Sequence, residues 1–161
     1  MAKDSVKTTV KGILTDYLEQ NHLRKTPERF AILNAIYSVN KHFTIRELGI
    51  WLEEHHFPVS LATLYNSIHL FMQLKLVTSH TLNTGTVYEA SYGMENTIRQ
   101  ICRVCGKSQD VKSVAVTKAV AETRLHRFRR SDYTLFIYGT CSNCQARLTR
   151  IKNKNNKTKK K

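Results

Sequence analysis

Two pairs of cysteines constrain the fold of this chain more than any other feature of its sequence. Cys102 and Cys105 form one CxxC pair, Cys141 and Cys144 form the other, and the chain contains no further cysteine. Two thiolates at this spacing can reach one tetrahedral Zn²⁺, and two pairs complete a closed site with four sulfur ligands. The 35 residues between the pairs must then leave the site and return to it. We therefore expect a compact unit folded around a structural zinc ion.

Other uses of paired cysteines fit this sequence less well. A thioredoxin-like motif has one CxxC at the start of a helix, not two matched pairs. Covalent attachment of c-type haem needs a histidine after the second cysteine, where this chain has Gly106 and Gln145. A secreted disulfide scaffold conflicts with the missing signal peptide. Oxidation of exposed zinc-bound thiolates stays open as a further chemistry.

The N-terminal part of the chain has the apolar periodicity of helices. Helices are expected over residues 6–20, 29–39, 45–52 and 60–74. Helix-start signals precede the last three of them: Thr26-Pro27, the capping box Thr44-x-x-Glu47, and Ser60. In the last helix, helical spacing predicts an inner apolar stripe of Leu61, Leu64, Ile68 and Phe71.

A hairpin follows these helices. Residues 77–80 and 87–90 are strand candidates, and the LNTGT segment between them has glycine at its tip. Three or four helices followed by a β-hairpin is the order of a winged helix-turn-helix. We therefore assign residues 1–90 to a winged-helix DNA-binding domain.

The pattern changes again after residue 90. Strand-like residues 109–115 precede a helix near 116–126 and a second strand at 132–139. Such a β-α-β piece is too small to cover both faces of its sheet, so we expect it to pair with a second copy in a homodimer. Residues 91–151 are therefore assigned to a dimerisation and zinc-binding domain, and the predicted fold class is α+β.

The charge of the chain is high and uneven. The formal net charge is +14, and residues 1–80 carry 9 Lys or Arg against 7 Asp or Glu. Residues 81–161 carry 17 against 5, and six lysines lie in the last ten residues. Such a charge indicates a polyanionic partner, which for a winged helix is double-stranded DNA. Residues 152–161 cannot bury surface, so we expect a disordered basic tail that either solubilises the protein or binds phosphate.

Membrane and enzyme classes are not expected. The chain has no run of 18 apolar residues, and its first twelve residues lack an apolar signal-peptide core, so we expect a cytoplasmic protein with no membrane partner. No nucleophile–base pair or Gly-rich phosphate loop is evident, and a zinc with four protein ligands has no open position. We therefore expect no enzymatic activity.

Several motifs in order resemble the ferric uptake regulator family. They are TPERFAIL, HFTIREL, LATLY, GTVYEA, CRVCGK and LFIYGTCSNC, and the resemblance covers roughly residues 8–148. Proteins of this family are dimeric, metal-responsive repressors of iron, zinc or peroxide-stress genes. The resemblance therefore implies a repressor that binds DNA as a dimer.

The resemblance also implies a DNA-binding surface. The helix with the LATLY run is expected to enter the major groove with Tyr65 touching bases, and Arg24 and Lys25 to contact phosphate or a minor groove. From the residues alone, the capped start of this helix presents polar groups that can read base edges, namely Ser60, Thr63, Tyr65 and Asn66. The alternative is a structural role, in which Tyr65 packs against the wing. Asn66 stands where the family typically has arginine, and asparagine favours adenine over guanine.

The regulatory metal site departs furthest from the family pattern. Family members carry a histidine-rich run before the first CxxC, whereas this chain has GMENTIRQIC with no histidine. Arg99 brings a fixed positive charge to the place of a divalent cation. His42, Glu89 and Asp110 align with family ligand positions and could form a residual site. Their alternative role is structural, as a helix-entry histidine and two surface carboxylates.

Three functions follow from these features. The first is a homodimeric DNA-binding transcription regulator with structural zinc and a degenerate regulatory metal site, which responds to redox state or haem. The second is an iron- or zinc-responsive repressor that uses His42, Glu89 and Asp110. The third belongs to another class, a non-specific zinc-ribbon nucleic-acid binder dominated by its lysine tail. A second metal or haem as cofactor stays open at this stage.

Overall fold

The computed structural model describes residues 2–39 and 41–158, with side chains for 5–39 and 41–152, and divides into two compact units. The units are the chain up to Thr81 with Gly85–Gly93, and Leu82–Thr84 with the chain from Met94 onward. Of the helices described, none is long and apolar enough to cross a membrane.

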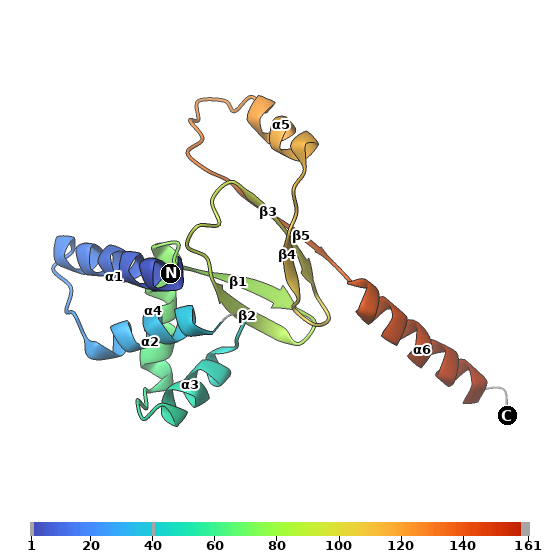
Figure 1. Ribbon diagram of the computed structural model, residues 1–161, viewed down its shortest axis with the longest axis horizontal. Helices are drawn as coiled ribbons and strands as arrows, with labels where there is room; N and C mark the ends of the chain where they lie inside the picture. Colours follow the sequence, from blue (N-terminus) through green and yellow to red (C-terminus); the bar gives the residue numbers. More distant parts are fainter. Residues whose placement is uncertain (1, 40, 159–161) are drawn as a thin grey trace. The chain divides into compact units, whose positions relative to one another are not determined.

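The first unit has the order of elements that the sequence predicts, with helices first and a hairpin last (Figure 1). Its elements are α1 (Ala2–Gln20), α2 (Pro27–Ser38), α3 (Ile45–Glu54), α4 (Leu61–Gln73), β1 (Val77–Leu82) and β2 (Gly85–Ala90). An isolated bridge between Phe43 and Tyr88 ties the segment before α3 to the hairpin.

The core of this unit collects one apolar face from each helix. Leu14 of α1, Leu33 of α2 and Phe71 of α4 are each 0% exposed. Within the stripe predicted for α4, Leu64 is buried as well, but Leu61 is 61% exposed. Leu61 is the first residue of α4. Leu61 has the helical spacing of the stripe, but at the start of α4 its side chain is left uncovered.

Two helix starts form the caps that the sequence predicts. In α3, the Glu47 N–H donates to Thr44 Oγ1 (3.2 Å) and the Thr44 N–H donates to Glu47 Oε2 (2.7 Å), which completes the capping box. In α4, the Thr63 N–H donates to Ser60 Oγ (3.2 Å). Thr26 is the N-cap of α2, but its side chain makes no capping hydrogen bond.

Replacing Thr44 by alanine should lower the free energy of unfolding by about 1 kcal/mol, because Thr→Ala at an N-cap leaves orphan N–H groups without an acceptor. Denaturant unfolding at pH 7 measures this loss. Thr9→Ala is the matched control, since Thr9 lies exposed inside α1 and alanine is the better helix former there. An equal loss in both variants would contradict a capping role for Thr44.

The same cap should give a pH dependence. Backbone and side-chain hydrogen bonds from Thr44 hold the pKa of Glu47 below its ordinary value of 4.5. A depressed pKa in the folded state stabilises the protein above pH ~4.5, and this part is lost as the pH falls through the folded-state pKa. The difference between wild type and Thr44→Ala should therefore shrink at pH 3.

The second unit is built on a three-stranded sheet with the order β4-β3-β5. The central strand β3 pairs antiparallel with β4 and parallel with β5, with Arg99 opposite Asp110 and Cys102 opposite Gly139. Helix α5 lies in the connection between β4 and β5, and α6 follows β5 (Figure 1). The elements are β3 (Thr97–Cys102), β4 (Ser108–Asp110), α5 (Val114–Glu122), β5 (Thr134–Gly139) and α6 (Ser142–Thr158).

Three expectations for this unit need correction. The strand expected at 109–115 is only the short β4. The strand β5 pairs with β3, which was not predicted from the sequence. The helix expected near 116–126 is α5, Val114–Glu122. The tail expected to be disordered from residue 152 continues α6 as far as Thr158, and residues 159–161 lie outside the described residues. No Gly or Pro follows Gly139, so nothing in the sequence stops this helix.

The first unit ends close to the boundary expected near residues 90–96. The Ser91 N–H donates to the Leu76 carbonyl (3.0 Å), and the Tyr92 N–H donates to Tyr37 Oη (3.3 Å). Both bonds attach this stretch to the first unit, which therefore extends to Gly93.

Candidate metal centre and DNA-binding surface

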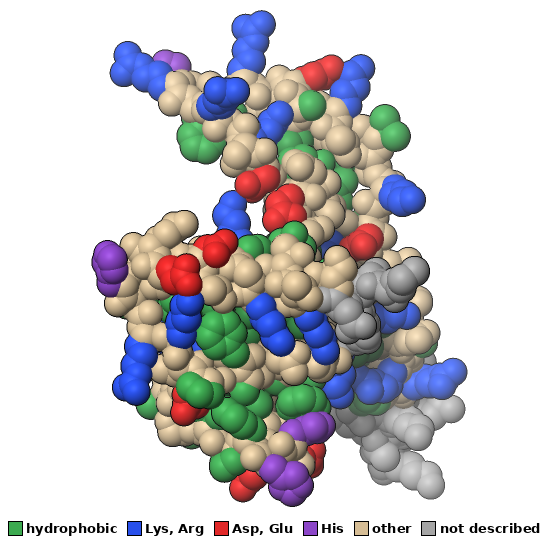
Figure 2. All heavy atoms as spheres, turned by 60° about the vertical axis from the view of Figure 1, so that its left-hand side comes forward, with side chains coloured by type: hydrophobic (Ala, Val, Ile, Leu, Met, Phe, Trp, Pro, Cys, Tyr) green, Lys and Arg blue, Asp and Glu red, His purple; other side chains and the backbone are tan. Residues whose placement is uncertain are grey.

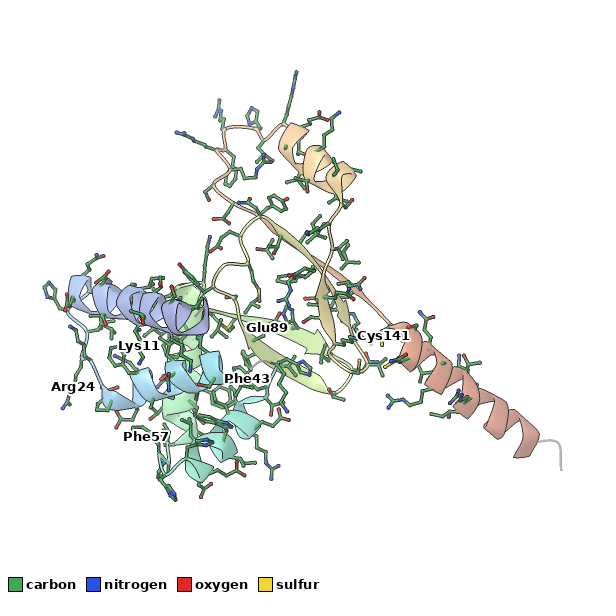
Figure 3. All side chains as sticks on the ribbon, viewed as in Figure 1. Lys11, Arg24, Phe43, Phe57, Glu89 and Cys141 are labelled. Carbon is green, nitrogen blue, oxygen red and sulfur yellow. The ribbon has the colours of Figure 1, made fainter. Side chains whose placement is uncertain are left out.

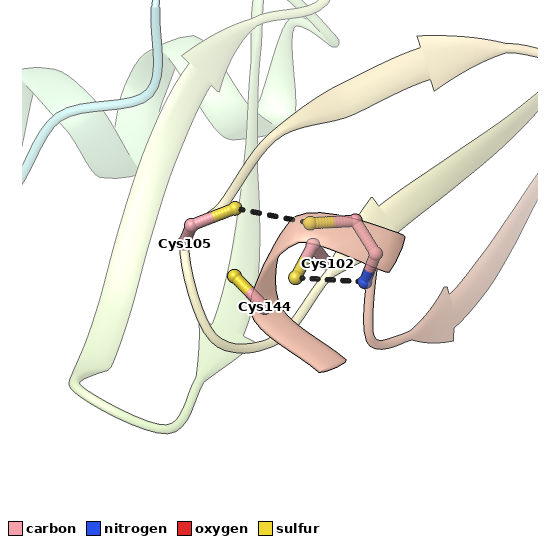
Figure 4. A group of neighbouring side chains, drawn as sticks. Cys102, Cys105 and Cys144 are labelled. Carbon is pink, nitrogen blue, oxygen red and sulfur yellow. Dashed lines mark hydrogen bonds between the residues drawn. The ribbon is translucent and has the colours of Figure 1, made fainter. Parts of the chain in front are cut away.

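The four cysteines form one cluster in the second unit. Cys102 ends β3, Cys105 lies in the following turn, Cys141 directly precedes α6 and Cys144 lies in its first turn (Figures 3 and 4). Their sulfur atoms all lie within 4.8 Å of one another, and Cys105 Sγ is 3.8 Å from Cys141 Sγ. None of the four forms a disulfide. The clustering that the CxxC spacing predicts is confirmed.

Strand pairing explains why the two pairs meet. Cys102 is the register partner of Gly139 in the parallel pair β3–β5, and the Arg103 N–H donates to the Gly139 carbonyl (2.8 Å). Both CxxC pairs therefore begin at the same end of the sheet. A Zn–S bond of about 2.3 Å gives tetrahedral sulfur–sulfur edges of about 3.8 Å. The donor set and its spacing thus fit a four-coordinate zinc ion.

Backbone N–H groups favour the thiolate form of one cysteine in this cluster. Burial would raise the pKa of Cys102, but N–H groups of Cys141, Cys105 and Val104 lower this pKa to about 6. The Cys141 N–H, for example, lies 3.3 Å from Cys102 Sγ (Figure 4). Burial, followed by the neighbouring sulfurs, raises the pKa of Cys144 to about 12. Several thiolates this close together repel one another, and a divalent cation among the sulfurs would neutralise their negative charge.

Arg99 of β3 forms side-chain contacts with the neighbouring strand β4. Its Nε lies 2.9 Å from Asp110 Oδ1 on β4, and the Arg99 side chain is only 15% exposed. The Arg99 guanidinium also donates from Nη2 to Ser108 Oγ (3.1 Å) and from Nη1 to Met94 Sδ (3.3 Å). Asp110, a residual metal-ligand candidate, is therefore half of an ion pair.

Glu89, the second carboxylate candidate, also has a partner. His80 Nε2 lies 2.7 Å from Glu89 Oε1, and His80 is 4% exposed (Glu89 is labelled in Figure 3). His80 was not among the site residues predicted from the sequence, although its even spacing from Leu82 on a strand indicates the same face of that strand. His42 is half-buried and lies in the first unit with Glu89, whereas Asp110 lies in the second.

Clustering singles out the cysteines among candidate metal ligands. Over the side chains that the structure describes, they are the one group of three or more His, Cys, Asp or Glu with ligand atoms this close.

The outer face of α4 carries the expected DNA-binding residues. Tyr65 is 57% exposed and Asn66 is exposed, so both are accessible to a partner. Ser60 and Thr63 are engaged with each other, with their hydroxyl oxygens 2.9 Å apart. α4 contains no Lys, Arg, Asp or Glu. Its outer face therefore offers hydrogen bonds and apolar contact but no charge for phosphate.

The basic loop before α2 is less uniform than expected. Arg24 is exposed (Figure 3), and its carbonyl accepts a hydrogen bond from Arg29 Nη1 (2.6 Å). Lys25 is paired with Glu19 of α1. Arg24 is therefore the more available cation of the two.

Comparisons with known proteins agree on one family. The sequence profile of the ferric uptake regulator family matches residues 20–138. The ferric uptake regulation protein of Campylobacter upsaliensis is 28% identical over 139 residues, 84% of this chain and 88% of that protein. The peroxide-responsive repressor PerR of Staphylococcus aureus (strain Mu50) is 28% identical over 130 residues, 80% of this chain and 86% of that protein.

Solved structures show the same fold. The Helicobacter pylori ferric uptake regulator, which has three functional metal-binding sites, superposes with a TM-score of 0.63 at 17% identity, over 86% of this chain and 93% of that one. The Pseudomonas aeruginosa ferric uptake regulator with manganese superposes with a TM-score of 0.63 at 23% identity, over 80% and 97%. The family profile spans most of the chain, and the order of elements agrees with it. This chain belongs to the ferric uptake regulator family.

Proposed function

We propose that this chain is a homodimeric DNA-binding transcription regulator that carries a structural zinc ion and whose regulatory metal site is replaced by an ion pair between Arg99 and Asp110. Family membership supports the regulator. The exposed outer face of α4, with Tyr65 and Asn66, supports base reading in a major groove. The exposed Arg24 supports a contact to phosphate beside it.

The cysteine cluster supports the zinc ion. Cys102, Cys105, Cys141 and Cys144 would supply all four ligands, which leaves no open position for a substrate or water. When bound, the ion supplies a cross-link between the ends of β3 and β5 and the start of α6. Its role in the proposal is therefore structural, not catalytic.

Uncovered apolar surface in the second unit supports the homodimer. Val114 of α5 is 86% exposed, and Ile137 and Tyr138 of β5 are 46% and 36% exposed. No residue of α5 is buried. A helix and a sheet edge that keep this much apolar surface in water gain stability when a second copy covers them.

The observation that carries the proposal is the position of Arg99. Family members place metal-binding histidines where this chain has TIRQ, and here the Arg99 guanidinium lies against Asp110 at 2.9 Å. A fixed positive charge repels a divalent cation at the same carboxylate. Glu89 is likewise held by His80 at 2.7 Å. The remaining signals for this regulator are thiol oxidation at the cysteine cluster, or haem.

Added Mn²⁺ or Fe²⁺ should change the affinity of the protein for its operator by less than about threefold, since the candidate carboxylates are already paired. The operator is first obtained by selecting bound genomic fragments, and a footprint with two-fold symmetry is expected. Binding is then titrated by fluorescence anisotropy with and without metal.

A hundredfold tightening by metal would contradict the replaced site and favour the second function, a repressor that uses His42, Glu89 and Asp110. In that case Asp110→Asn should abolish the metal response. Equal binding of all duplexes with no footprint would instead favour the non-specific nucleic-acid binder.

A further inference from the structure

We propose that the loop between α5 and β5, residues 123–131, is a second DNA contact that binds the phosphate backbone of duplex DNA without sequence preference. We call it the arginine loop. It carries four arginines and one histidine and no acidic residue. The inference goes beyond the base reading assigned to α4 and uses none of its residues.

One arginine holds the loop in place. The Arg130 guanidinium donates to the carbonyls of Val120 and Ala121 in the last turn of α5, the second at 3.4 Å. A cation at this position donates hydrogen bonds to carbonyls of the last helical turn and interacts favourably with the negative end of the helix dipole. At the end of the loop, Ser131 Oγ donates to Asp132 Oδ2 (3.1 Å). The loop is therefore anchored through a guanidinium that serves the fold.

The other three arginines have no such task. Arg124, Arg127 and Arg129 are exposed, and among the described residues no hydrogen bond or ion pair involves their side chains. Two apolar side chains beside them are also uncovered, with Leu125 42% and Phe128 69% exposed. Figure 2 shows Lys, Arg and His side chains on the surface around α5 and this loop. Three free guanidinium groups within six residues form a concentrated site for anions.

The number and spacing of the guanidinium groups indicate which kind of anion the arginine loop binds. Guanidinium groups bind phosphate bidentately, and several in one loop match a polymer of phosphates better than a single small anion. The chain keeps its positive charge away from the helix that reads bases, because α4 has no Lys or Arg. Residues 1–80 have a net charge of +2, against +12 for residues 81–161. Phosphate neutralisation, the main source of non-specific DNA affinity, must therefore come largely from the second part of the chain.

The test uses the full-length protein and a variant with Arg124→Gln, Arg127→Gln and Arg129→Gln. Binding to a 30-base-pair duplex without operator sequence is measured by fluorescence anisotropy at several NaCl concentrations. The variant should bind about tenfold or more weaker near 0.1 M salt, and the slope of log K against log[salt] should fall by about 2 to 3, since each phosphate contact contributes ~0.9.

The matched control removes three positive charges elsewhere in the second unit, with Lys107→Gln, Lys112→Gln and Lys118→Gln. These side chains are exposed, so the control has the same net charge as the arginine variant but keeps the arginine loop intact. It should change the slope by less than about 1. Equal loss in both triple variants would show a net-charge effect and overturn the proposal, as would an unchanged slope in the arginine variant.

Two further measurements distinguish this proposal from single-strand binding and from the proposed regulator function. Phe128→Ser should leave duplex binding nearly unchanged. Preferential binding of a single strand that this substitution abolishes would mean base stacking and overturn the duplex assignment. The operator footprint should persist in the arginine variant. A missing footprint in the wild type would refute the proposed regulator and leave the salt-slope result for the loop valid.

Discussion

Replacing Cys144 by serine should abolish zinc binding and unfold the second unit. Cys144 is 5% exposed, and its sulfur lies within 4.8 Å of the other three. Among the described residues of this unit, the buried apolar side chains are few: Leu82, Ile98, Ile101 and the two buried cysteines. The binding free energy of a structural zinc site is folding free energy, about 10 kcal/mol or more in small domains. Losing one of four ligands should therefore remove most of the stability of this unit.

Metal analysis and thermal unfolding measure the result. The wild type should hold about one zinc per chain after purification without chelator, and Cys144→Ser close to none. Asn143→Ala is the matched control, because Asn143 is exposed and lies between the two cysteines of the second pair. The first unit has its own core around Phe71 and Leu14, so helical circular dichroism should survive in part. A wild type without zinc, or a variant with native zinc content and melting, would refute the structural site.

Replacing Tyr65 by alanine should weaken operator binding by about ten- to a hundredfold, the range expected for a base contact worth ~1–3 kcal/mol. Tyr65 is 57% exposed on the outer face of α4. Its removal creates no cavity, so thermal stability should stay nearly constant. The measurement is anisotropy on the selected operator, together with a melting curve.

Met72→Ala controls for the loss of an exposed apolar side chain, since Met72 is 38% exposed near the end of the same helix. It should bind the operator like the wild type. If Tyr65→Ala lowers the melting temperature markedly and keeps full affinity, the tyrosine packs against the wing and does not touch bases. Asn66→Arg adds a specificity test, because it should shift the preferred base from adenine towards guanine.

Local patterns in the sequence predicted much of this protein. The capping box at Thr44 and Glu47 and the Ser60 cap depend on residues three apart, and both form as predicted. The prediction of a buried stripe on α4 was wrong only at Leu61. This residue has the right spacing, but it lies at the start of the helix, where its side chain is uncovered. The CxxC spacing predicted the cysteine cluster because two thiolates three residues apart suit one metal wherever the chain folds.

Long-range pairing decided the rest. The TIRQIC segment contains several polar residues, so its sequence does not indicate a strand. It is the central strand β3 only because it pairs with both β4 and β5. Register then places Arg99 opposite Asp110, a partner eleven residues away. Likewise, only the folded chain distinguishes Arg130, which caps α5, from the free arginines beside it. The sequence alone determined the family, the caps of α3 and α4 and the cysteine cluster, because these depend on spacing along the chain. The tertiary structure decided which charges are paired and which stay free, because such pairing depends on strand register and helix ends distant in sequence.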